Sequence, residues 1–334
     1  MTTQRPRVLI TWPFPEPGPR MVEEVCDATR WSGKLPMPRA EFLRMLPDLD
    51  GLMVMNVAEK LDREAFEAAP RLRVVSDFGV GYDNVDVPAA TERGILVCNT
   101  PGAMVECVAD HTFALLLAVG RRLPKGQADV REGRWRTWLI ESIVGQELYG
   151  ATLGIIGLGN IGAAVARRAR GFSMRILYTG RTRKPEAEAA LGVEWMPMDD
   201  LLRQSDYISI HTPLTQETRG LIGRRELALL KPTAILVNTA RGGVVDQQAL
   251  IDVLREGKIY GAGLDVTDPE PLPTDSPLLT LENTIVLPHN GSAGANTRAR
   301  MSQLAATNLI EGLSGRRPPH LVNPAAWEQR QGAS

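Results

Sequence analysis

The sequence predicts an α/β protein of two domains, each built on a parallel sheet with helices on both faces. One observation is the length, since 334 residues exceed what a single hydrophobic core usually organises. A second is the alternation of short apolar runs with helical stretches along the chain. The third is a glycine-rich turn that follows an apolar run at residues 153–156 and opens a helix. Such a turn is typical of a doubly wound sheet.

Four buried strands are expected in the first part of the chain, at residues 7–11, 51–55, 72–76 and 95–99. The first run ends in a proline-rich stretch, residues 12–19, where regular structure cannot continue. A short amphipathic helix is predicted at residues 40–46, and Thr100-Pro101-Gly102 marks a boundary. Buried strands that alternate with helices favour a parallel sheet.

A long helix is predicted at residues 105–122, where apolar side chains are too dense for a surface helix, and Pro124 should end it. Further strands are expected at residues 175–179, 207–210, 234–238, 261–265 and 284–287, with a helix at 247–255. Because the glycine turn opens its domain in mid-chain, a helix at 293–312 should return to the first domain. The predicted domains are a discontinuous flavodoxin-like domain, residues 1–100 and 290–334, and a doubly wound Rossmann domain, residues 101–289.

Composition excludes several classes of function. A formal net charge of -1 gives no attraction to nucleic acid or to a membrane surface. The three cysteines, Cys26, Cys98 and Cys107, have no metal-like spacing, so free thiols in a reducing compartment and no metal site are expected. The first residues lack a signal-peptide core, and no apolar run reaches the length of a membrane helix. A cytoplasmic protein is the expectation.

The glycine turn matches the G-x-G-x-x-G pattern of dinucleotide-binding sites. Gly157 permits a tight turn, Gly159 lets a pyrophosphate approach the backbone, and Gly162 lets the helix pack against the strand. Phosphate oxygens then meet N–H groups at the helix N-terminus. The alternative is a turn whose glycines serve packing alone. The predicted cofactor-binding residues of the turn are Gly157, Leu158, Gly159, Asn160, Ile161 and Gly162.

Cofactor preference is predicted from the end of the next strand. NAD-binding domains place an acid there, about twenty residues past the turn, to hold the ribose 2′-hydroxyl. This chain has Thr179-Gly180 followed by Arg181-Thr182-Arg183-Lys184, without a carboxylate. Arginine forms charge-assisted hydrogen bonds with a 2′-phosphate. Arg181, Thr182 and Arg183 therefore predict binding of NADP(H), with NAD(H) as the alternative that binds more weakly. A solvated basic loop is the alternative.

Polar residues follow three consecutive strands of the second half. Arg241 comes after the run 234–238, Asp265 ends the run 261–265, and His289 comes after the run 284–287. Ligands of open α/β sheets bind at the carboxyl ends of the strands. An arginine, a carboxylate and a histidine at one sheet edge indicate a catalytic site.

The motifs V-N-T-A-R-G, G-L-D-V, P-E-P-L-P and L-P-H-x-G-S, in this order, resemble those of the D-isomer-specific 2-hydroxyacid dehydrogenases. The glyoxylate/hydroxypyruvate reductase branch is the most similar. Val80-Gly81-Tyr82-Asp83, Asn99-Thr100-Pro101 and the segment with Trp135 and Trp138 are similar as well, so the likeness covers nearly the whole chain.

The resemblance implies reduction of a small 2-keto acid, with glyoxylate and hydroxypyruvate as leading candidates, to a D-2-hydroxy acid by hydride from NADPH. Arg241 would hold the substrate carboxylate and polarise the carbonyl, since a guanidinium fork binds two oxygens and keeps its charge. His289 would give the proton, oriented by Glu270. The alternative to these catalytic roles is that Arg241 is a solvated residue, Glu270 a surface charge and His289 a structural residue.

The family also assigns the N–H groups of Val80 and Gly81 to the substrate carboxylate, and a turn flanked by glycines can aim amides at an anion. A turn without a ligand is the alternative. The expected pocket lining is Asn56, Val57, Ser292 and Trp138. Asn290 departs from the family, which commonly has an apolar residue there. The cleft is expected between the domains, closing to exclude water.

The remaining cofactor contacts implied by the resemblance are His211, Thr212, Pro213, Thr239, Asp265 and Gly291. Asp265 would accept from the nicotinamide carboxamide; a helix-capping aspartate is the alternative. His211 should line the site without moving a proton, while His111 and His320 are expected to be structural.

A homodimer is expected by resemblance, with the long helix and the Trp135 segment at the interface; core-capping tryptophans are the alternative. Relatives of the fold include corepressors, so a cofactor-sensing binding protein is the second hypothesis, against which Arg241, Glu270 and His289 argue. A formate-dehydrogenase-like enzyme would have glutamine at Glu270. A reductase of 2-ketogluconate or another sugar acid is a further alternative within the family.

Overall fold

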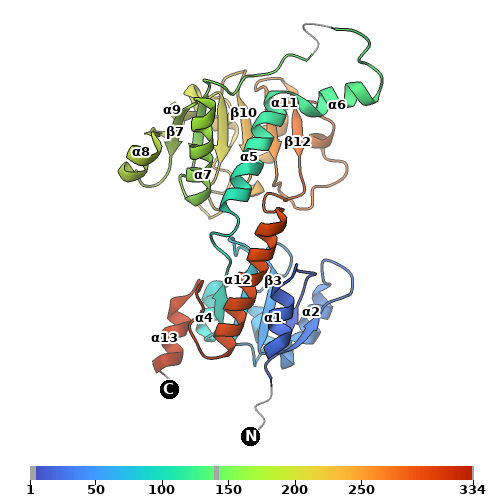
Figure 1. The fold of residues 1–334 in the computed structure, drawn as a ribbon, viewed down its shortest axis with the longest axis vertical. Helices are drawn as coiled ribbons and strands as arrows, with labels where there is room; N and C mark the ends of the chain where they lie inside the picture. Colours follow the sequence, from blue (N-terminus) through green and yellow to red (C-terminus); the bar gives the residue numbers. More distant parts are fainter. Residues whose placement is uncertain (1–4, 139–142, 333–334) are drawn as a thin grey trace. The chain divides into compact units, whose positions relative to one another are not determined.

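The computed structural model describes residues 5–138 and 143–332. The chain forms two compact units, the first of Met1–Met104 and Gly294–Ser334, the second of Val105–Ala293 (Figure 1). The unit boundaries follow Met104 and Ala293, whereas residues 100 and 289 were expected. The first difference arises because Ala103 and Met104 pack against a hydrophobic cluster of unit 1.

Unit 1 contains a five-stranded sheet of order β2-β1-β3-β4-β5, with every neighbouring pair parallel. Its strands are β1 (Arg7–Ile10), β2 (Asp27–Arg30), β3 (Gly51–Met55), β4 (Val74–Phe78) and β5 (Leu96–Cys98). This order is that of flavodoxin-like folds. Sequence reasoning missed β2, whose D-A-T-R run is mostly exposed and has no apolar pattern.

Helices cover both faces of this sheet. One face packs on α1 (Gly18–Val25) and α12 (Ala295–Leu313), the other on α2 (Arg39–Met45), α3 (Arg63–Glu67) and α4 (Val87–Glu92). The predicted return of the late helix to unit 1 is seen in α12, whose Ala305 O accepts from Ser76 Oγ of β4 at 2.7 Å.

The last segment of the chain covers the edge strand β5. Leu321 forms an antiparallel bridge with Cys98, and the Val322 N–H donates to Val97 O at 2.8 Å. The chain then enters α13 (Pro324–Gly332), a helix that sequence reasoning did not predict.

Unit 2 contains a seven-stranded parallel sheet of order β12-β11-β10-β9-β6-β7-β8. Its strands are β6 (Thr152–Ile156), β7 (Arg175–Thr179), β8 (Glu194–Trp195), β9 (Tyr207–Ile210), β10 (Ile235–Asn238), β11 (Gly261–Leu264) and β12 (Thr284–Val286). The order reverses at β6, so the doubly wound prediction is confirmed. The two-residue edge strand β8 is too short to give a sequence signal.

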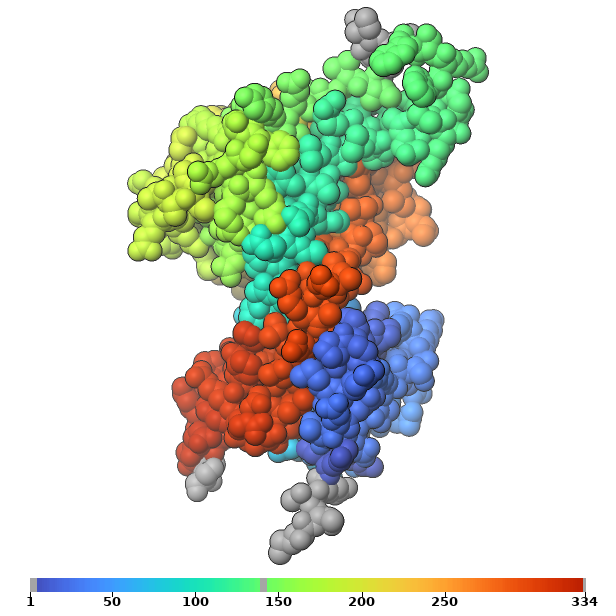
Figure 2. Space-filling view, viewed as in Figure 1, coloured from blue at the N-terminus to red at the C-terminus, as the bar shows by residue number. Residues whose placement is uncertain are grey.

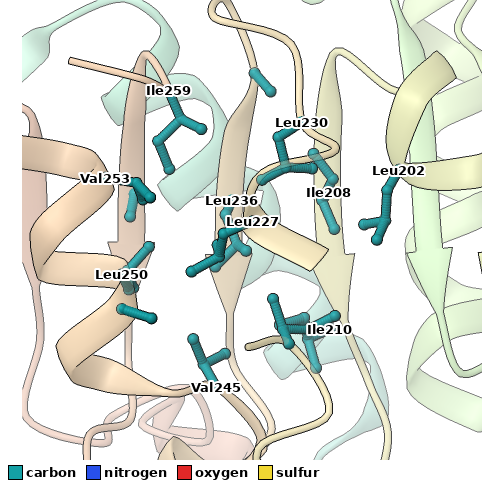
Figure 3. Close-up of a cluster of buried hydrophobic side chains, with 14 of the residues drawn as sticks. Leu202, Ile208, Ile210, Leu227, Leu230, Leu236, Val245, Leu250, Val253 and Ile259 are labelled. Carbon is teal, nitrogen blue, oxygen red and sulfur yellow. The ribbon is translucent and has the colours of Figure 1, made fainter. Parts of the chain in front are cut away.

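Two apolar layers sandwich this sheet. On one face lie α5 (Val105–Gly120), α7 (Asn160–Ala169) and α8 (Pro185–Leu191), and on the other α9 (Met198–Gln204), α10 (Arg224–Leu227) and α11 (Gln247–Arg255). Figure 3 shows the second layer, where Leu227 lies next to Leu236 of β10. The 3₁₀ turns are η1 (Leu46–Asp48), η2 (Arg170–Phe172), η3 (Gly242–Val244) and η4 (Pro277–Leu279).

The expectation that Pro124 ends the long helix is wrong. The helix α5 ends at Gly120, and Arg122 takes a left-handed conformation with φ of 51°. Pro124 then lies in the first turn of a new helix, α6 (Leu123–Arg131), where its missing N–H costs nothing. The α6 segment stands out from the body of unit 2 (Figure 2). Within the described ranges, no helix has the length and apolar character needed to cross a membrane.

Candidate functional site

The glycine turn between β6 and α7 has the geometry that its pattern predicts. Gly157 has φ of 96°, and a Cβ there would lie 2.8 Å from His211 O. A Cβ on Gly162 would collide with Gly157 O, so the helix approaches the turn as closely as the backbone allows. A Cβ on Gly159 would instead meet no atom within 4 Å. The lack of a side chain at Gly157 and Gly162 therefore allows close packing of the backbone, and the lack of one at Gly159 leaves space for a ligand.

The helix N-terminus above this turn fits a phosphate group. Gly159 is the N-cap residue of α7, and no side chain caps the helix. The first N–H groups of a helix, here those of Asn160 and Ile161, have no acceptor within the helix. Together with the helix dipole they favour an anion at this point. The turn therefore fits the pyrophosphate of a dinucleotide.

The basic segment after β7 is arranged by a buried tyrosine and a glutamate. Arg183 forms an ion pair with Glu188 at 2.8 Å, and Tyr178 Oη donates to the same carboxylate at 2.7 Å. Arg183 and then Tyr178 hold the pKa of Glu188 at about 2. Lys184 Nζ donates to Leu158 O in the glycine turn at 2.7 Å. The segment therefore brings Lys184 against the turn, while Arg183 is turned toward α8; Arg181 and Thr182 are exposed.

His211, Thr212 and Pro213 form the start of the loop that follows β9. His211 Nε2 lies 2.7 Å from Ser209 Oγ, and burial lowers the pKa of this histidine to about 3. A neutral ring at physiological pH follows, which suits a residue that lines the site without exchanging a proton.

The loop that follows β10 is fixed by Asn238, which is 1% exposed. Its side chain accepts from the Ala240 N–H at 3.0 Å and donates to Arg241 O at 2.9 Å. Thr239 Oγ1 lies 3.0 Å from Thr112 Oγ1 of α5, which fixes the middle of the loop. Arg241 is thereby held at the carboxyl end of β10, as its position after that strand predicts.

Glu270 and His289 are in direct contact. Glu270 Oε2 lies 2.9 Å from His289 Nδ1, and the two side chains are 29% and 31% exposed. Glu270 Oε1 accepts from the Thr267 N–H at 3.0 Å, which fixes the carboxylate. The ring therefore presents Nε2 as its other nitrogen. His289 has φ of 52°, a left-handed conformation that residues with side chains rarely adopt.

Asp265 anchors the loop that carries this histidine. Its Oδ1 accepts from the Asn290 N–H at 2.9 Å and its Oδ2 from the Gly291 N–H at 2.8 Å, while its main-chain oxygen accepts from the His289 N–H at 2.9 Å. Asp265 is 1% exposed, and its burial favours the neutral form. The nearby His111 imidazole, 3.1 Å away, and the two N–H groups outweigh this effect and lower the pKa of Asp265.

Sequence reasoning missed this anchoring role of Asp265 and the place of His111 beside it. One signal was available. Asp265 follows β11 and the loop with His289 follows the neighbouring strand β12, so both lie at the same edge of the sheet. Gly291 is needed here, because a Cβ would lie 2.9 Å from Asp265 Oδ2. Ser292 follows in the same loop and is half-buried. Arg241, Asp265 and His289 thus lie at the carboxyl ends of three adjacent strands.

The predicted substrate residues of unit 1 lie around the turn 79–81. Asn56 Nδ2 donates to Gly81 O at 3.3 Å, and a Cβ on Gly79 would collide with the Asn56 side chain. Val57 is 55% exposed beside Asn56. Val80 is half-buried within the same turn. Unit 1 therefore brings these residues together on the loops that follow β3 and β4.

The predicted pocket residue Trp138 is largely exposed. It is 90% exposed, and Trp135 is 65% exposed, in the segment that follows α6. The interpretation of these tryptophans as caps of a core is therefore wrong for the isolated chain. Among residues 5–138 and 143–332, no three histidine, cysteine or acidic side chains are grouped so as to hold a metal ion.

Known proteins are similar to this chain in sequence and in fold. Residues 113–291 match the model of the D-isomer specific 2-hydroxyacid dehydrogenase, NAD binding domain. A glyoxylate reductase of Korarchaeum cryptofilum is 49% identical over 320 residues, 96% of each chain.

Two solved structures extend the likeness to the whole chain. The TT0316 protein from Thermus thermophilus is 44% identical with a TM-score of 0.88, over 95% of this chain and 99% of that one. The NADPH-dependent glyoxylate/hydroxypyruvate reductase from Sinorhizobium meliloti, solved with NADP and malonate, is 35% identical with a TM-score of 0.83, over 97% and 98%. The chain therefore belongs to the D-isomer-specific 2-hydroxyacid dehydrogenase family and, as the glyoxylate reductases among its relatives support, is a 2-keto acid reductase.

Proposed function

We propose that the protein reduces glyoxylate or hydroxypyruvate to the corresponding 2-hydroxy acid, with NADPH in preference to NADH. The observation that carries the proposal is the contact of 2.9 Å between Glu270 and His289 at the sheet edge where Arg241 also lies. A carboxylate that orients an imidazole is the arrangement needed for proton transfer to a reacting oxygen.

NADPH supplies the hydride when it is bound. The N–H groups of Asn160 and Ile161 would hold its pyrophosphate, with Gly159 leaving the space. After β7 the chain has no carboxylate at Thr179 or Gly180, and Arg181 follows directly. Arg181 is a cation that a 2′-phosphate can pair with, which supports NADPH. The relative from Sinorhizobium meliloti is likewise described as NADPH-dependent.

Arg241 would bind the carboxylate of the substrate and polarise its keto oxygen. Its guanidinium keeps its charge at every physiological pH, and its planar fork can contact two oxygens. Asn238 holds the main chain of Arg241 through a bond of 2.9 Å, and Arg241 Nη1 donates to Ala240 O at 2.8 Å, so both the loop and the guanidinium are held.

His289 would donate a proton from Nε2 to the oxygen that becomes the hydroxyl. Nδ1 faces Glu270, so the carboxylate orients the ring and Nε2 is left for the substrate. In the oxidative direction the neutral ring would accept the same proton. His211 does not compete, since burial lowers its pKa to about 3.

A homodimer is part of the proposal. Trp135 and Trp138 are exposed in the segment after α6, and exposed tryptophans are favoured at protein interfaces. A second copy of the chain would cover them.

The test measures NADPH and NADH oxidation with glyoxylate, hydroxypyruvate, pyruvate and 2-ketogluconate. We expect the highest kcat/KM for glyoxylate or hydroxypyruvate with NADPH. Tight NADPH binding without turnover of any of these acids would refute the proposed reductase activity and favour a cofactor-sensing binding protein. Preference for 2-ketogluconate would refute the proposed substrates alone, and preference for NADH would refute the proposed cofactor alone.

A further inference from the structure

We propose that Asn99, fixed by Asn308, is a positioning residue that aims the N–H groups of Val80 and Gly81 at the carboxylate of the substrate. The inference rests on the proposed function, because it presumes that a 2-keto acid binds at this turn. Both asparagines lie in unit 1, and neither needs to touch the substrate.

The carbonyl oxygens of the turn are held by the loop after β5. Gly79 O accepts from the Thr100 N–H at 2.7 Å and from Thr100 Oγ1 at 3.2 Å. Val80 O accepts from Asn99 Nδ2 at 2.7 Å. Two successive peptide groups therefore direct their oxygens toward two successive residues of one loop.

The direction of the N–H groups follows from the planar peptide unit. In a trans peptide the carbonyl and the next N–H point in opposite directions. The oxygen of Gly79 faces Thr100, so the Val80 N–H faces away from it. The oxygen of Val80 faces Asn99, so the Gly81 N–H also faces away from that loop.

Two consecutive N–H groups that face one way form a site for an anion. Asn56 supports this arrangement from the loop after β3, because its Nδ2 donates to Gly81 O at 3.3 Å. Each of the three oxygens of the turn is thus held by a polar group, which leaves the N–H side for a ligand. The substrate carboxylate is the anion that the proposed reaction provides.

Asn99 is itself fixed by two segments distant in sequence. Asn308 of α12 is fully buried, and its Nδ2 donates to Asn99 O at 2.8 Å. Its Oδ1 accepts from the His320 N–H at 3.1 Å, and the Asn99 N–H donates to His320 O at 3.2 Å. The carboxamide both donates and accepts at this buried position, whereas a carboxylate lacks the donor and an apolar side chain lacks both.

This arrangement predicts a defect in substrate binding that spares the chemical step. Replacing Asn99 by alanine removes the donor that holds the Val80 peptide, while Arg241 and His289 are untouched. Loss of one hydrogen bond, with the disorder it allows in the turn, corresponds to roughly a tenfold rise in KM. The cofactor contacts lie in unit 2 and should not change.

The experiment compares Asn99→Ala and Asn99→Ser with Asn308→Ala and with a matched control. The control is Asn323→Ala, because Asn323 is also a buried carboxamide, and it holds β5 through Val97 and Ile95 without touching the turn. For each variant we would measure KM and kcat for glyoxylate, the inhibition constant of oxamate, the Kd of NADPH and the urea midpoint.

We expect both Asn99 variants to raise KM and the oxamate inhibition constant about tenfold, with kcat within about threefold and the NADPH Kd unchanged. Asn308→Ala should give a smaller rise in the same two constants, and Asn323→Ala a lower urea midpoint alone. KM and oxamate inhibition unchanged in the Asn99 variants would overturn the inference. Absence of glyoxylate turnover in the unaltered enzyme would instead refute the proposed function.

Discussion

The Gly291 N–H donates to Oδ2 of Asp265 at 2.8 Å, so a buried carboxylate holds the loop on which His289 lies. Replacing Asp265 by asparagine keeps the size of the side chain but places an amide group against one of the two N–H donors. We expect Asp265→Asn to lower the free energy of unfolding by about 1–3 kcal/mol, the range for a buried donor left without an acceptor. The kcat should fall as well, because His289 loses its support. Urea unfolding and steady-state kinetics check both.

The effect of Asp265 on stability should depend on pH in a defined direction. Its pKa in the folded protein is lowered from 3.8, so its carboxylate stabilises the fold above the pKa of the unfolded chain. That stabilisation is lost as the pH falls through the lowered pKa. The difference in unfolding free energy between the unaltered protein and Asp265→Asn should be constant near neutral pH and shrink below about pH 4. A difference that grows in acid would contradict the assignment.

His289→Ala should lower kcat by roughly 10²- to 10⁴-fold, because the proton donor is lost. Glu270→Gln should have a smaller effect in the same direction, since the amide can still orient the ring but lacks the negative charge of the carboxylate. The Kd of NADPH should stay unchanged in both. His320→Ala is the matched control, because the main chain of His320 carries its bonds to Asn99 and Asn308. Near-normal turnover in His289→Ala would exclude this residue from the reaction.

The glycines of the turn should separate binding from folding. Gly159→Ser keeps a residue suited to the N-cap of α7, but its side chain enters the open side of the turn. We expect near-normal stability with NADPH affinity reduced at least tenfold. Gly157→Ala should instead destabilise the fold, because φ is 96° and its Cβ would lie 2.8 Å from His211 O. Fluorescence titration and thermal unfolding measure the two effects; normal NADPH affinity in Gly159→Ser would argue against this phosphate site.

Arg181→Ala should weaken NADPH binding by roughly 10- to 100-fold while leaving NADH almost unaffected, because a charge-assisted bond to the 2′-phosphate is lost. Arg183→Ala should weaken NADPH less, since its guanidinium is already paired with Glu188 at 2.8 Å. Arg203→Ala, an exposed ion-paired arginine on α9, serves as the control. Titration with both cofactors measures the two affinities. Equal losses of affinity for NADPH and NADH would refute the proposed contact between Arg181 and the 2′-phosphate.

Replacing Trp135 and Trp138 together by serine should shift the protein toward a monomer in sedimentation velocity, because their exposed rings would lose the partner copy. Trp195→Ser, which alters an exposed ring on the edge strand β8, should leave the sedimentation coefficient unchanged. A monomer for the unaltered protein at all concentrations would contradict the homodimer.

Much of the fold could be predicted from the sequence because its strands are apolar on both faces. Each run from β6 to β12 that carries such a pattern was placed within a residue or two, and α11 was placed without error. The strands β2 and β8 could not be found, since both are exposed and short. Pro124 misled the prediction because proline suits the first turn of a helix as well as the end of one.

The candidate site was predictable as residue types at strand ends, but its contacts were not. The pairing of Arg183 with Glu188 depends on how α8 turns after β7. The anchoring of the His289 loop by Asp265 depends on main-chain N–H groups, which leave no trace in residue identity. Asn308 and Asn99 are far apart in the sequence and meet only because α12 packs on the sheet of unit 1.

The bridge between Leu321 and Cys98 also covers the edge of the unit 1 sheet at β5. Edge strands expose unpaired N–H and C=O groups that can recruit strands of other molecules. Val322 occupies Val97 O and Asn323 occupies the Val97 N–H, so the main chain of β5 is already satisfied where its side chains are most apolar. Residues 321–323 thus occupy the edge of β5 at which another strand could be added.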